Sequence, residues 1–396
     1  MACDLLIIGG GMATARLVEG LSKHRYPYRV TVISAEHTFG YNRVLLPDLL
    51  SGHCAMNDLL ARGVEDRSEA ELNLDLKCGV QVEEVDLTNK LAQLSTGECL
   101  SYKQLVFSTG SKVNAPAIPG IGLDNVVELR CLEDVHRLQG LVKHAATVTV
   151  LGGGLLGLEA GKALLQQGLE VSVVHRGAHL MNRQLDQEGA ELLQRKLMAQ
   201  GFNFELGRSV VEVKGETQVR SITLDDGTEH STDILLLATG VQASDALAVA
   251  AGLECDQGIK VNGQLEASTP NVFALGECAK VSGIHHCLVD PVFHQADVLA
   301  GNLCGGNAKC EFPAPSTRLK ISGVEVFSAG DVSTQDPEPD NEVRVVSDEV
   351  YRRLLFRQQV LHGAVLVGDS LGAAKIHQSI GERLSPKERE RLAFGL

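Results

Sequence analysis

Short apolar runs recur along the chain, and at two places such a run leads into a glycine-rich turn. Leu5–Ile8 precedes Gly9–Thr14, and Val148–Leu151 precedes Gly152–Gly157. Runs of four apolar residues are typical of buried strands, and we expect a helix after each turn, near Met12 in the first. A strand, a glycine turn and a helix together place backbone amides where they can bind a pyrophosphate.

The two turns differ at the third glycine position of the motif. Gly152–Gly157 fits G-x-G-x-x-G in full, whereas Thr14 stands where the first turn should have its last glycine. Helix–strand packing must therefore accept a β-branched residue at Thr14. The alternative to a phosphate-binding turn is an ordinary turn between a strand and a helix. The predicted phosphate-binding residues are Gly9, Gly11, Met12 and Ala13 in the first turn, and Gly152, Gly154, Leu155, Leu156 and Gly157 in the second.

The first unit continues with a helix to about Lys23 and a strand at Val30–Ser34. Glu36 follows that strand, where an acid can bind the two ribose hydroxyls of a nucleotide. Arg43, in a loop that leads into a short helix, can pair with a pyrophosphate because guanidinium matches phosphate geometry. The alternatives are a surface glutamate and a solvated loop arginine.

The pattern then changes to short alternating strands, from Lys77 to Gly110, and a similar stretch follows the second glycine turn. The spacing from Gly97 to Gly110 equals that from Gly227 to Gly240. Each stretch ends in an apolar run followed by a Thr-Gly turn. We therefore predict an internal duplication that produces two dinucleotide-binding domains. The turn residues are Thr109 and Gly110 in the first copy, and Thr239 and Gly240 in the second.

The second copy departs from the first where nucleotide specificity is set. His175 and Arg176 follow its second strand, at a place where an NAD-selective site usually has an acid. An arginine there can accommodate a 2′-phosphate. A plain surface role for Arg176 is the alternative, and neither residue decides between NADH and NADPH.

Beyond Gly240 we expect a linker with one amphipathic helix, Ser244–Ala251, and then a strand that ends in Gly276-Glu277. Such an end can place a carboxylate or a backbone amide against a ribityl or pyrophosphate group. An apolar helix follows, from Val292 to about Leu303. After a proline break, strands at Val343–Val346, Val350–Phe356 and His362–Val367 and two short helices complete the chain, with a solvated loop at 336–340.

Composition narrows the class of protein. The net charge of −14 argues against a nucleic-acid partner, whose binders need a basic surface. No run reaches the roughly 18 apolar residues that cross a bilayer. The first strand begins at residue 4 and leaves no room for a signal peptide, so we expect a cytoplasmic protein. The ten cysteines lack a disulfide-scaffold or metal spacing, and the role of Cys304 and Cys310 stays open.

The two glycine turns, both Thr-Gly turns and the segment Asn271–Cys278 resemble the flavoprotein family with two dinucleotide-binding domains, which includes glutathione, rubredoxin and ferredoxin reductases. The resemblance implies that the first turn binds FAD, that the second binds NAD(P)H, and that Gly276 and Glu277 contact the flavin nucleotide. We also expect Glu159, on the helix after the second turn, to lie near the nicotinamide.

A narrower resemblance rests on Tyr41–Leu46, Ser316–Val324, Val350–Leu354 and His362–Asp369. These segments are similar to the flavoprotein portion of assimilatory nitrite reductases and to electron-transfer subunits of assimilatory nitrate reductases. By this resemblance Lys320 lies close to the flavin ring, with a structural salt bridge as the alternative. The cysteine pair of disulfide reductases is missing from this chain, which argues against dithiol exchange.

The resemblance implies an α/β fold with two Rossmann-like domains, each with an antiparallel β insertion, and a small α+β C-terminal domain. We expect an FAD-binding domain at 1–112 and 241–312, an NAD(P)H-binding domain at 113–240, and an interface domain at 313–396. The expected activity is electron transfer from NAD(P)H through FAD to a nitrate or nitrite reductase partner. A rubredoxin or ferredoxin reductase is the alternative, and a non-catalytic flavoprotein sensor is a third. We expect no metal site, and the oligomeric state stays open.

Overall fold

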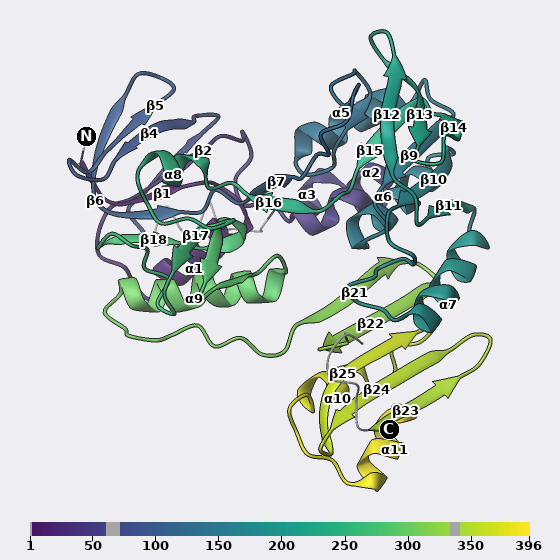
Figure 1. Cartoon of the computed structure of the whole chain (residues 1–396). Coiled ribbons are helices and arrows are strands. Elements are labelled where there is room, and N and C mark those ends of the chain that lie inside the picture. The colour runs from purple at the N-terminus through teal and green to yellow at the C-terminus, as the bar shows by residue number, and fades with distance from the viewer. Residues whose placement is uncertain (1, 61–71, 333–340) are drawn as a thin grey trace. The chain divides into compact units, whose positions relative to one another are not determined.

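The computed structural model describes residues 2–60, 72–332 and 341–396, which form two compact units (Figure 1). The first unit comprises Met1–Leu45, Cys54–Lys112 and Val241–Phe312. The second comprises Leu46–His53, Val113–Gly240 and Pro313–Leu396. None of the helices in the described ranges is long and apolar enough to span a bilayer.

The first unit is built on a mixed sheet with the order β3-β2-β1-β6-β5-β4, and β18 pairs with the end of β6. The strands β3, β2, β1, β6 and β18 run parallel, whereas β4 and β5 form an antiparallel extension. The elements of the sheet are β1 (Ala2–Ile8), β2 (Val30–Ser34), β3 (Leu74–Cys78), β4 (Val82–Asp86), β5 (Leu91–Leu94), β6 (Cys99–Phe107) and β18 (Val272–Ala274).

Two helices pack against each other beside this sheet, α1 (Met12–Lys23) and α9 (Val289–Leu303). Their close approach requires a glycine, because a Cβ at Gly20 would lie 2.6 Å from the Cβ of Ala300. The remaining elements of the unit are α3 (Met56–Leu59), β7 (Ser111–Val113), β16 (Val241–Ala243), α8 (Ala246–Ala250), β17 (Ile259–Val261), β19 (Ala279–Val281) and β20 (Ile284–His285). The expected helix to Lys23 and the strand at Val30–Ser34 are confirmed.

The second unit repeats the parallel part of this design with the order β11-β10-β9-β15-β8. Its antiparallel insertion forms a separate sheet, β12-β13-β14. The elements are β8 (Val126–Val127), α5 (Leu132–Val142), β9 (Thr147–Leu151), α6 (Leu155–Gln166), β10 (Glu170–His175), α7 (Gln187–Met198), β11 (Phe202–Leu206), β12 (Val210–Gly215), β13 (Val219–Leu224), β14 (Glu229–Ser231) and β15 (Ile234–Leu237).

The copies differ because β6 is one continuous strand, whereas its counterpart is interrupted between β14 and β15. Asp233 lies in the interruption, and its carboxylate accepts hydrogen bonds from the amides of Ala146 (2.9 Å) and Thr147 (3.0 Å). These bonds, that from Ala146 first, lower the pKa of Asp233. The carboxylate therefore joins the start of β9 to the start of β15, and the insertion separates from the main sheet.

The short helix α2 (Leu46–Ser51) packs in the second unit, although the sequence placed it in the first domain. It contacts α5 and α6, and the Gln167 side chain donates to the carbonyl of Ser51 (3.0 Å). The Gln139 side chain reaches the carbonyl of Leu49 (3.4 Å). Packing between segments far apart in the sequence decides this placement, and no local pattern reports it.

The C-terminal region is a five-stranded antiparallel sheet, β21-β22-β25-β24-β23, with its own apolar core. Its elements are β21 (Ser316–Ile321), β22 (Val324–Gly330), β23 (Asn341–Val346), β24 (Tyr351–Arg357), β25 (Val360–Val367), α10 (Ala373–Gln378) and α11 (Pro386–Ala393). The predicted meander corresponds to β23, β24 and β25, but the prediction missed β21 and β22. The predicted loop at 336–340 lies outside the described residues.

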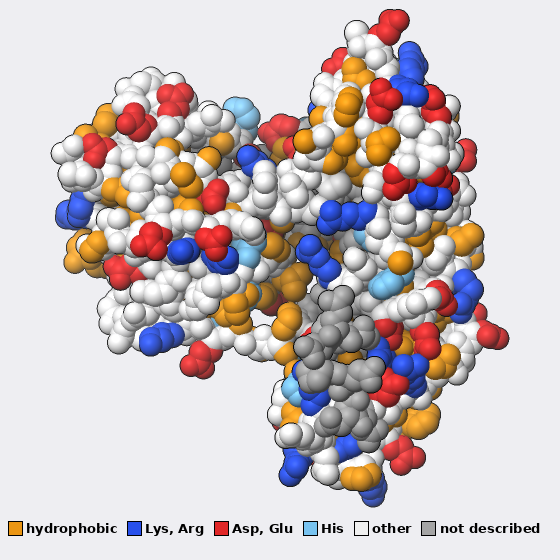
Figure 2. Space-filling view, in the orientation of Figure 1, with side chains coloured by type: hydrophobic (Ala, Val, Ile, Leu, Met, Phe, Trp, Pro, Cys, Tyr) orange, Lys and Arg blue, Asp and Glu red, His pale blue; other side chains and the backbone are white. Residues whose placement is uncertain are grey.

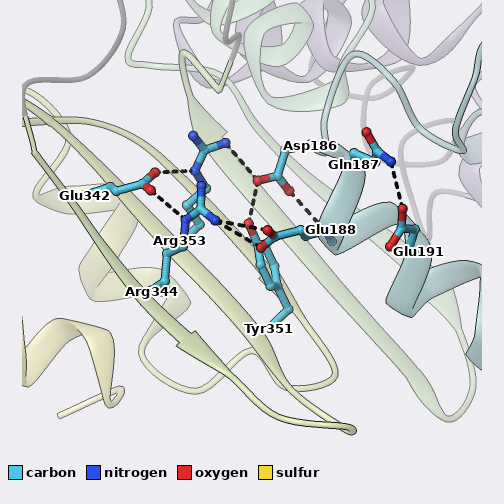
Figure 3. A network of polar contacts seen from close by, with 9 residues as sticks. Asp186, Gln187, Glu188, Glu191, Glu342, Arg344, Tyr351 and Arg353 are labelled. Atoms are coloured by element: carbon cyan, nitrogen blue, oxygen red, sulfur yellow. Dashed lines mark hydrogen bonds and ion pairs between the residues drawn. The ribbon is translucent and has the colours of Figure 1, made fainter.

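A polar network joins α7 to this C-terminal sheet within the second unit (Figure 3). Asp186 caps α7 by accepting from the amide of Gly189 (3.2 Å), and it also accepts from Tyr351 and Arg353 of β24. The Arg353–Asp186 pair is almost buried, with side chains 7% and 10% exposed. Glu342 of β23 holds the other edge of the Arg353 guanidinium at 2.9 Å.

Candidate nucleotide-binding sites

The first glycine turn is held against the end of β6, a position that only glycine can occupy. The amide of Gly9 donates to the carbonyl of Ile33 at 2.8 Å, and Gly9 has a φ of +115°. A Cβ at this position would lie 2.1 Å from the carbonyl oxygen of Ser108. The turn therefore brings backbone directly over the carboxyl edge of the sheet.

The second turn has the same geometry. The amide of Gly152 donates to the carbonyl of Val174 at 2.9 Å, and a Cβ on Gly152 would lie 2.2 Å from the carbonyl oxygen of Ala238. A Cβ on Gly157 would lie 2.1 Å from the carbonyl oxygen of Gly152. At each of these two positions a side chain would clash with a backbone carbonyl oxygen, so a glycine is required.

Thr14 replaces that last glycine in the first turn without a clash. It is fully buried, and its hydroxyl donates to the carbonyl of Gly9 at 2.7 Å. The side chain therefore closes the turn with a hydrogen bond where the second copy uses a close backbone contact.

Both helices that follow the turns begin at a glycine, Gly11 for α1 and Gly154 for α6, and neither has a side-chain cap. Helices leave their first amides without intrahelical partners, and these amides bind anions well. No heavy atom lies within 4 Å of a Cβ built on Gly154. The free space and the uncapped amides fit a pyrophosphate. The first amides are those of Met12 and Ala13 in α1, and those of Leu155 and Leu156 in α6.

Glu36 and Arg43, predicted for the ribose and the pyrophosphate, form an ion pair beside the first turn. The hydroxyl of Tyr41 also donates to the Glu36 carboxylate. The Arg43 guanidinium is the group nearest to Gly11, 3.8 Å from a Cβ built there. An acid and an arginine therefore lie together at the N-terminus of α1.

The Gly276-Glu277 turn lies against the same helix. Gly276 has a φ of +81°, and a Cβ on it would lie 3.3 Å from the Cβ of Ala13. Its amide donates to Oε1 of the fully buried Gln295 at 2.7 Å. Ser111 donates to the Glu277 carboxylate at 2.7 Å. Segments far apart in the sequence thus meet at the start of α1.

The Thr-Gly turns position the chain with their side chains. The Thr109 hydroxyl donates to the carbonyl of Ser244 at 2.6 Å, and the Thr239 hydroxyl donates to the carbonyl of Asn114 at 2.7 Å. The next residue in each turn is a glycine with a positive φ, +67° at Gly110 and +91° at Gly240. Both hydroxyls therefore fix the segments that follow the last parallel strand of each copy.

In the second copy, the His175 ring packs on the glycine turn, and its Nδ1 accepts from the amide of Gly153 at 3.2 Å. Burial lowers the pKa of His175, and the nearby His179 and Arg176 lower it further. Arg176 is exposed, and Glu159 is half-buried on α6. A neutral imidazole therefore stands where the first copy has Ser34.

Lys320 belongs to β21, where it pairs with Glu325 of β22, but its side chain is outside the described set. In the described part of the chain, no group of three or more His, Cys, Asp or Glu side chains is arranged to hold a metal ion. Burial raises the pKa of Cys304 and raises that of Cys310 to about 11.

Sequence reasoning missed the hydrogen bond of Thr14 and two further residues that shape the first site, Tyr41 and Gln295. Gln295 is a fully buried amide within a helix that was predicted from its apolar residues, and a polar residue on that apolar face was the available signal. For Tyr41, nothing in the sequence indicated that its hydroxyl donates a hydrogen bond to Glu36.

Comparison with known families decides the class. The model of the pyridine nucleotide-disulphide oxidoreductase family matches residues 3–295. The chain belongs to this family. Residues 315–384 match a second model, that of the C-terminal domain of rubredoxin NAD+ reductase. Membership of this oxidoreductase family assigns a flavin and a pyridine nucleotide to the chain.

Several curated members of the family are similar over nearly the whole chain. It is 34% identical to a nitrite reductase [NAD(P)H] of Bacillus subtilis over 99% of its length, and 34% identical to an assimilatory nitrate reductase electron transfer subunit of the same species over 95%. The chain spans 49% of each of these proteins. It is 32% identical to a nitric oxide reductase FlRd-NAD(+) reductase of Vibrio vulnificus, covering 85% of this chain and 87% of that protein.

Solved structures share the fold. A ferredoxin reductase of Rhodopseudomonas palustris superposes with a TM-score of 0.87 at 24% identity, covering 99% of this chain and 98% of its own. The NADH:rubredoxin oxidoreductase of Clostridium acetobutylicum superposes with a TM-score of 0.81 at 22% identity, covering 97% and 96%. These likenesses establish two Rossmann-like domains and a C-terminal sheet domain.

The family takes its name from a disulfide that this member lacks. The segment Tyr41–Leu46 holds Asn42, Arg43 and Val44 and no cysteine. A thiol relay next to the first nucleotide site is therefore missing from this sequence.

Proposed function

We propose that the chain is an FAD-dependent NAD(P)H oxidoreductase that delivers electrons to an iron-containing partner in assimilatory nitrate or nitrite reduction. The observation that carries the proposal is the pair of glycine turns with matching geometry in a family member without a cysteine pair. Two nucleotide cradles supply a route from nicotinamide to flavin, and the missing thiols leave a partner protein as the acceptor.

The first cradle would hold FAD. Met12 and Ala13 present uncapped helix amides to its pyrophosphate, and Arg43 stands beside them. Glu36 offers a carboxylate to the ribose, which requires it to exchange its bond with Arg43. Gly276 and Glu277 lie against Ala13 and would contact the ribityl chain and phosphates, with Thr109 and Gly110 fixing the chain nearby.

The second cradle would hold NADH or NADPH. Gly152, Gly154 and Gly157 admit the pyrophosphate, and the amides of Leu155 and Leu156 face it. When bound, a flavin supplies the chemistry that links a two-electron hydride donor to a one-electron acceptor. The protein's part is to bind and orient both nucleotides. Glu159 near the nicotinamide, Thr239 and Gly240 beside the second nucleotide, and Lys320 near the flavin ring complete the proposed assignments.

Two kinds of acceptor are supported by different observations. Two relatives at 34% identity take part in nitrite and nitrate reduction, according to their names. The match of 315–384 to a rubredoxin reductase domain, and the relative whose length is 87% covered, favour a rubredoxin-type acceptor. We give the first acceptor priority because of the higher identity. The ten cysteines lack a disulfide-scaffold spacing, which fits the reducing cytoplasm.

Rapid anaerobic mixing of the FAD-loaded protein with NADH and NADPH tests the reductase itself. We expect the flavin absorbance to bleach with at least one of the two nucleotides. A flavin that stayed oxidised with both would instead favour a non-catalytic sensor.

The acceptor is tested by turnover in parallel assays with a nitrate reductase catalytic subunit and with a rubredoxin, at equal concentrations. We expect faster turnover with the nitrate reductase subunit. Faster turnover with rubredoxin would reject the nitrate assignment and leave the reductase assignment intact.

A further inference from the structure

The two copies can be aligned by their hydrogen bonds, and this alignment exposes a difference in the second nucleotide site. In each copy the first glycine of the turn donates to a carbonyl near the end of the second strand, Ile33 in one and Val174 in the other. Three residues beyond these carbonyls stand Glu36 and Gly177. The position of the ribose-binding acid in the first copy is therefore a glycine in the second.

The loop that follows β10 contains no carboxylate before Asp186. Asp186 itself is engaged by Tyr351 and Arg353 in the α7 network. From His175, the last residue of β10, to Asp186 the chain instead carries two arginines, Arg176 and Arg183, and two histidines, His175 and His179. A ribose with free hydroxyls prefers an acid at this place, whereas a 2′-phosphate prefers cations.

His175 has a defined orientation. Because its Nδ1 accepts from the Gly153 amide, the neutral ring carries its proton on Nε2. Burial lowers the pKa of His175 from its usual value, and the nearby His179 and Arg176 lower it further. The imidazole therefore fills the position between turn and strand as a neutral group, and the adjacent cation is Arg176.

Of the two exposed arginines that follow β10, Arg183 and Arg176, the one directly at the end of the strand is Arg176. It is exposed, and it makes no ion pair with any residue that the structure describes. Arg208, whose amide bonds to the carbonyl of His175, has its own partners in Asp226 (3.0 Å) and Asp225 (3.9 Å). An arginine without a partner at the end of the second strand matches the geometry of a phosphate.

We propose that the second site is selective for NADPH, and that Arg176 sets this selectivity by binding the 2′-phosphate. The inference rests on the proposed function in one respect only, that the second glycine turn binds a pyridine nucleotide. It goes further in naming which nucleotide binds and which residue selects it.

The test is calorimetric binding of 2′,5′-ADP and 5′-ADP to the FAD-loaded chain, which needs no electron transfer. We expect 2′,5′-ADP to bind about 10- to 100-fold more tightly, the range for a charge-assisted contact. Arg176→Ala should remove at least about tenfold of that advantage and leave 5′-ADP binding unchanged. Arg176→Lys should keep part of it, and added salt should reduce it.

The matched control is Lys143→Ala, an exposed cation at the end of α5. The chain enters β9 shortly after Lys143, so this residue lies at the end of β9 opposite the glycine turn. We expect no change for this variant. Equal binding of both nucleotides to the unaltered protein, or an unchanged advantage in Arg176→Ala, would overturn the proposal. Either outcome would leave the reductase assignment standing, since that is tested separately by flavin bleaching.

Discussion

At the scale of single residues, the two glycine turns solve one steric problem in two ways. The last glycine of the motif is required in the second copy, where a Cβ on Gly157 would lie 2.1 Å from a backbone oxygen. In the first copy the same position holds Thr14, whose hydroxyl bonds to the carbonyl of Gly9. A departure from the motif is thus compensated by a buried hydrogen bond.

Replacing Thr14 by Val should therefore lower stability, although the two side chains have nearly the same shape. The change leaves the Gly9 carbonyl without this donor, which costs about 1–3 kcal/mol. Thermal unfolding of the FAD-loaded protein measures the loss, and we expect faster release of FAD as well. Thr14→Ser keeps the hydroxyl and serves as the control. A Val variant as stable as the Ser variant would show that the hydrogen bond is unimportant.

Gly154 and Gly157 should respond differently to alanine. A Cβ on Gly154 meets no atom within 4 Å, so Gly154→Ala should fold with unchanged stability. This variant should nevertheless bind 2′,5′-ADP at least about tenfold more weakly, because the methyl group occupies the space assigned to the pyrophosphate. Gly157→Ala should lower the unfolding temperature, since backbone must move. Normal binding by a folded Gly154→Ala protein would place the ligand elsewhere.

At the scale of elements, the sequence predicted the helices and strands whose bounds depend on neighbouring residues in the chain. Val30–Ser34 and the end of α1 at Lys23 could be read from apolar runs and turn residues. The placement of α2 in the second unit could not, because it depends on packing against α5 and α6. Strands β21 and β22 were missed because the proline break masked the start of their hairpin. For the site, glycines were predictable, but the partners of Glu36 were not.

The network at the start of α7 should matter far more than its exposed neighbours. Burial, followed by the Asp186 carboxylate, raises the pKa of Tyr351 well above its usual value, so the phenol stays protonated and donates. Asp186→Ala removes the helix cap and leaves the Arg353 guanidinium without one of its carboxylates. We expect a loss of about 3–5 kcal/mol, measured by urea unfolding of the full chain.

The control for this prediction lies in the same helical turn. Glu188 pairs with Arg344, but both side chains are substantially exposed, at 53% and 38%. Glu188→Ala should cost less than about 1 kcal/mol. Similar losses in the two variants would contradict the view that burial, rather than the number of ion pairs, fixes α7 to the C-terminal sheet.

At the scale of the whole molecule, charge and thiols bear on how electrons leave the protein. On the face drawn in Figure 2, acidic and basic side chains are interspersed, although the chain carries a net charge of −14. Thiols are numerous, yet burial raises the pKa of several of them, to about 12 for Cys131 and about 11 for Cys255. Such thiols stay protonated at neutral pH and are poor nucleophiles.

Electron transfer should therefore survive blocking of the accessible thiols. Treatment with iodoacetamide at pH 7 should modify the exposed Cys99 and Cys287 first. The rate of flavin bleaching by NADPH and the turnover with the proposed protein acceptor should both stay within about twofold of the untreated values, because the proposed route has no step through sulfur. The buried thiols should react only as the pH rises toward their pKa values, since only the thiolate is alkylated.

Glutathione reductase, treated in its reduced form, is the positive control, because its chemistry uses a cysteine pair. If alkylation at pH 7 abolished turnover while bleaching continued, a thiol would lie between flavin and acceptor after all. Serine variants of Cys99 and Cys287 would then identify which one.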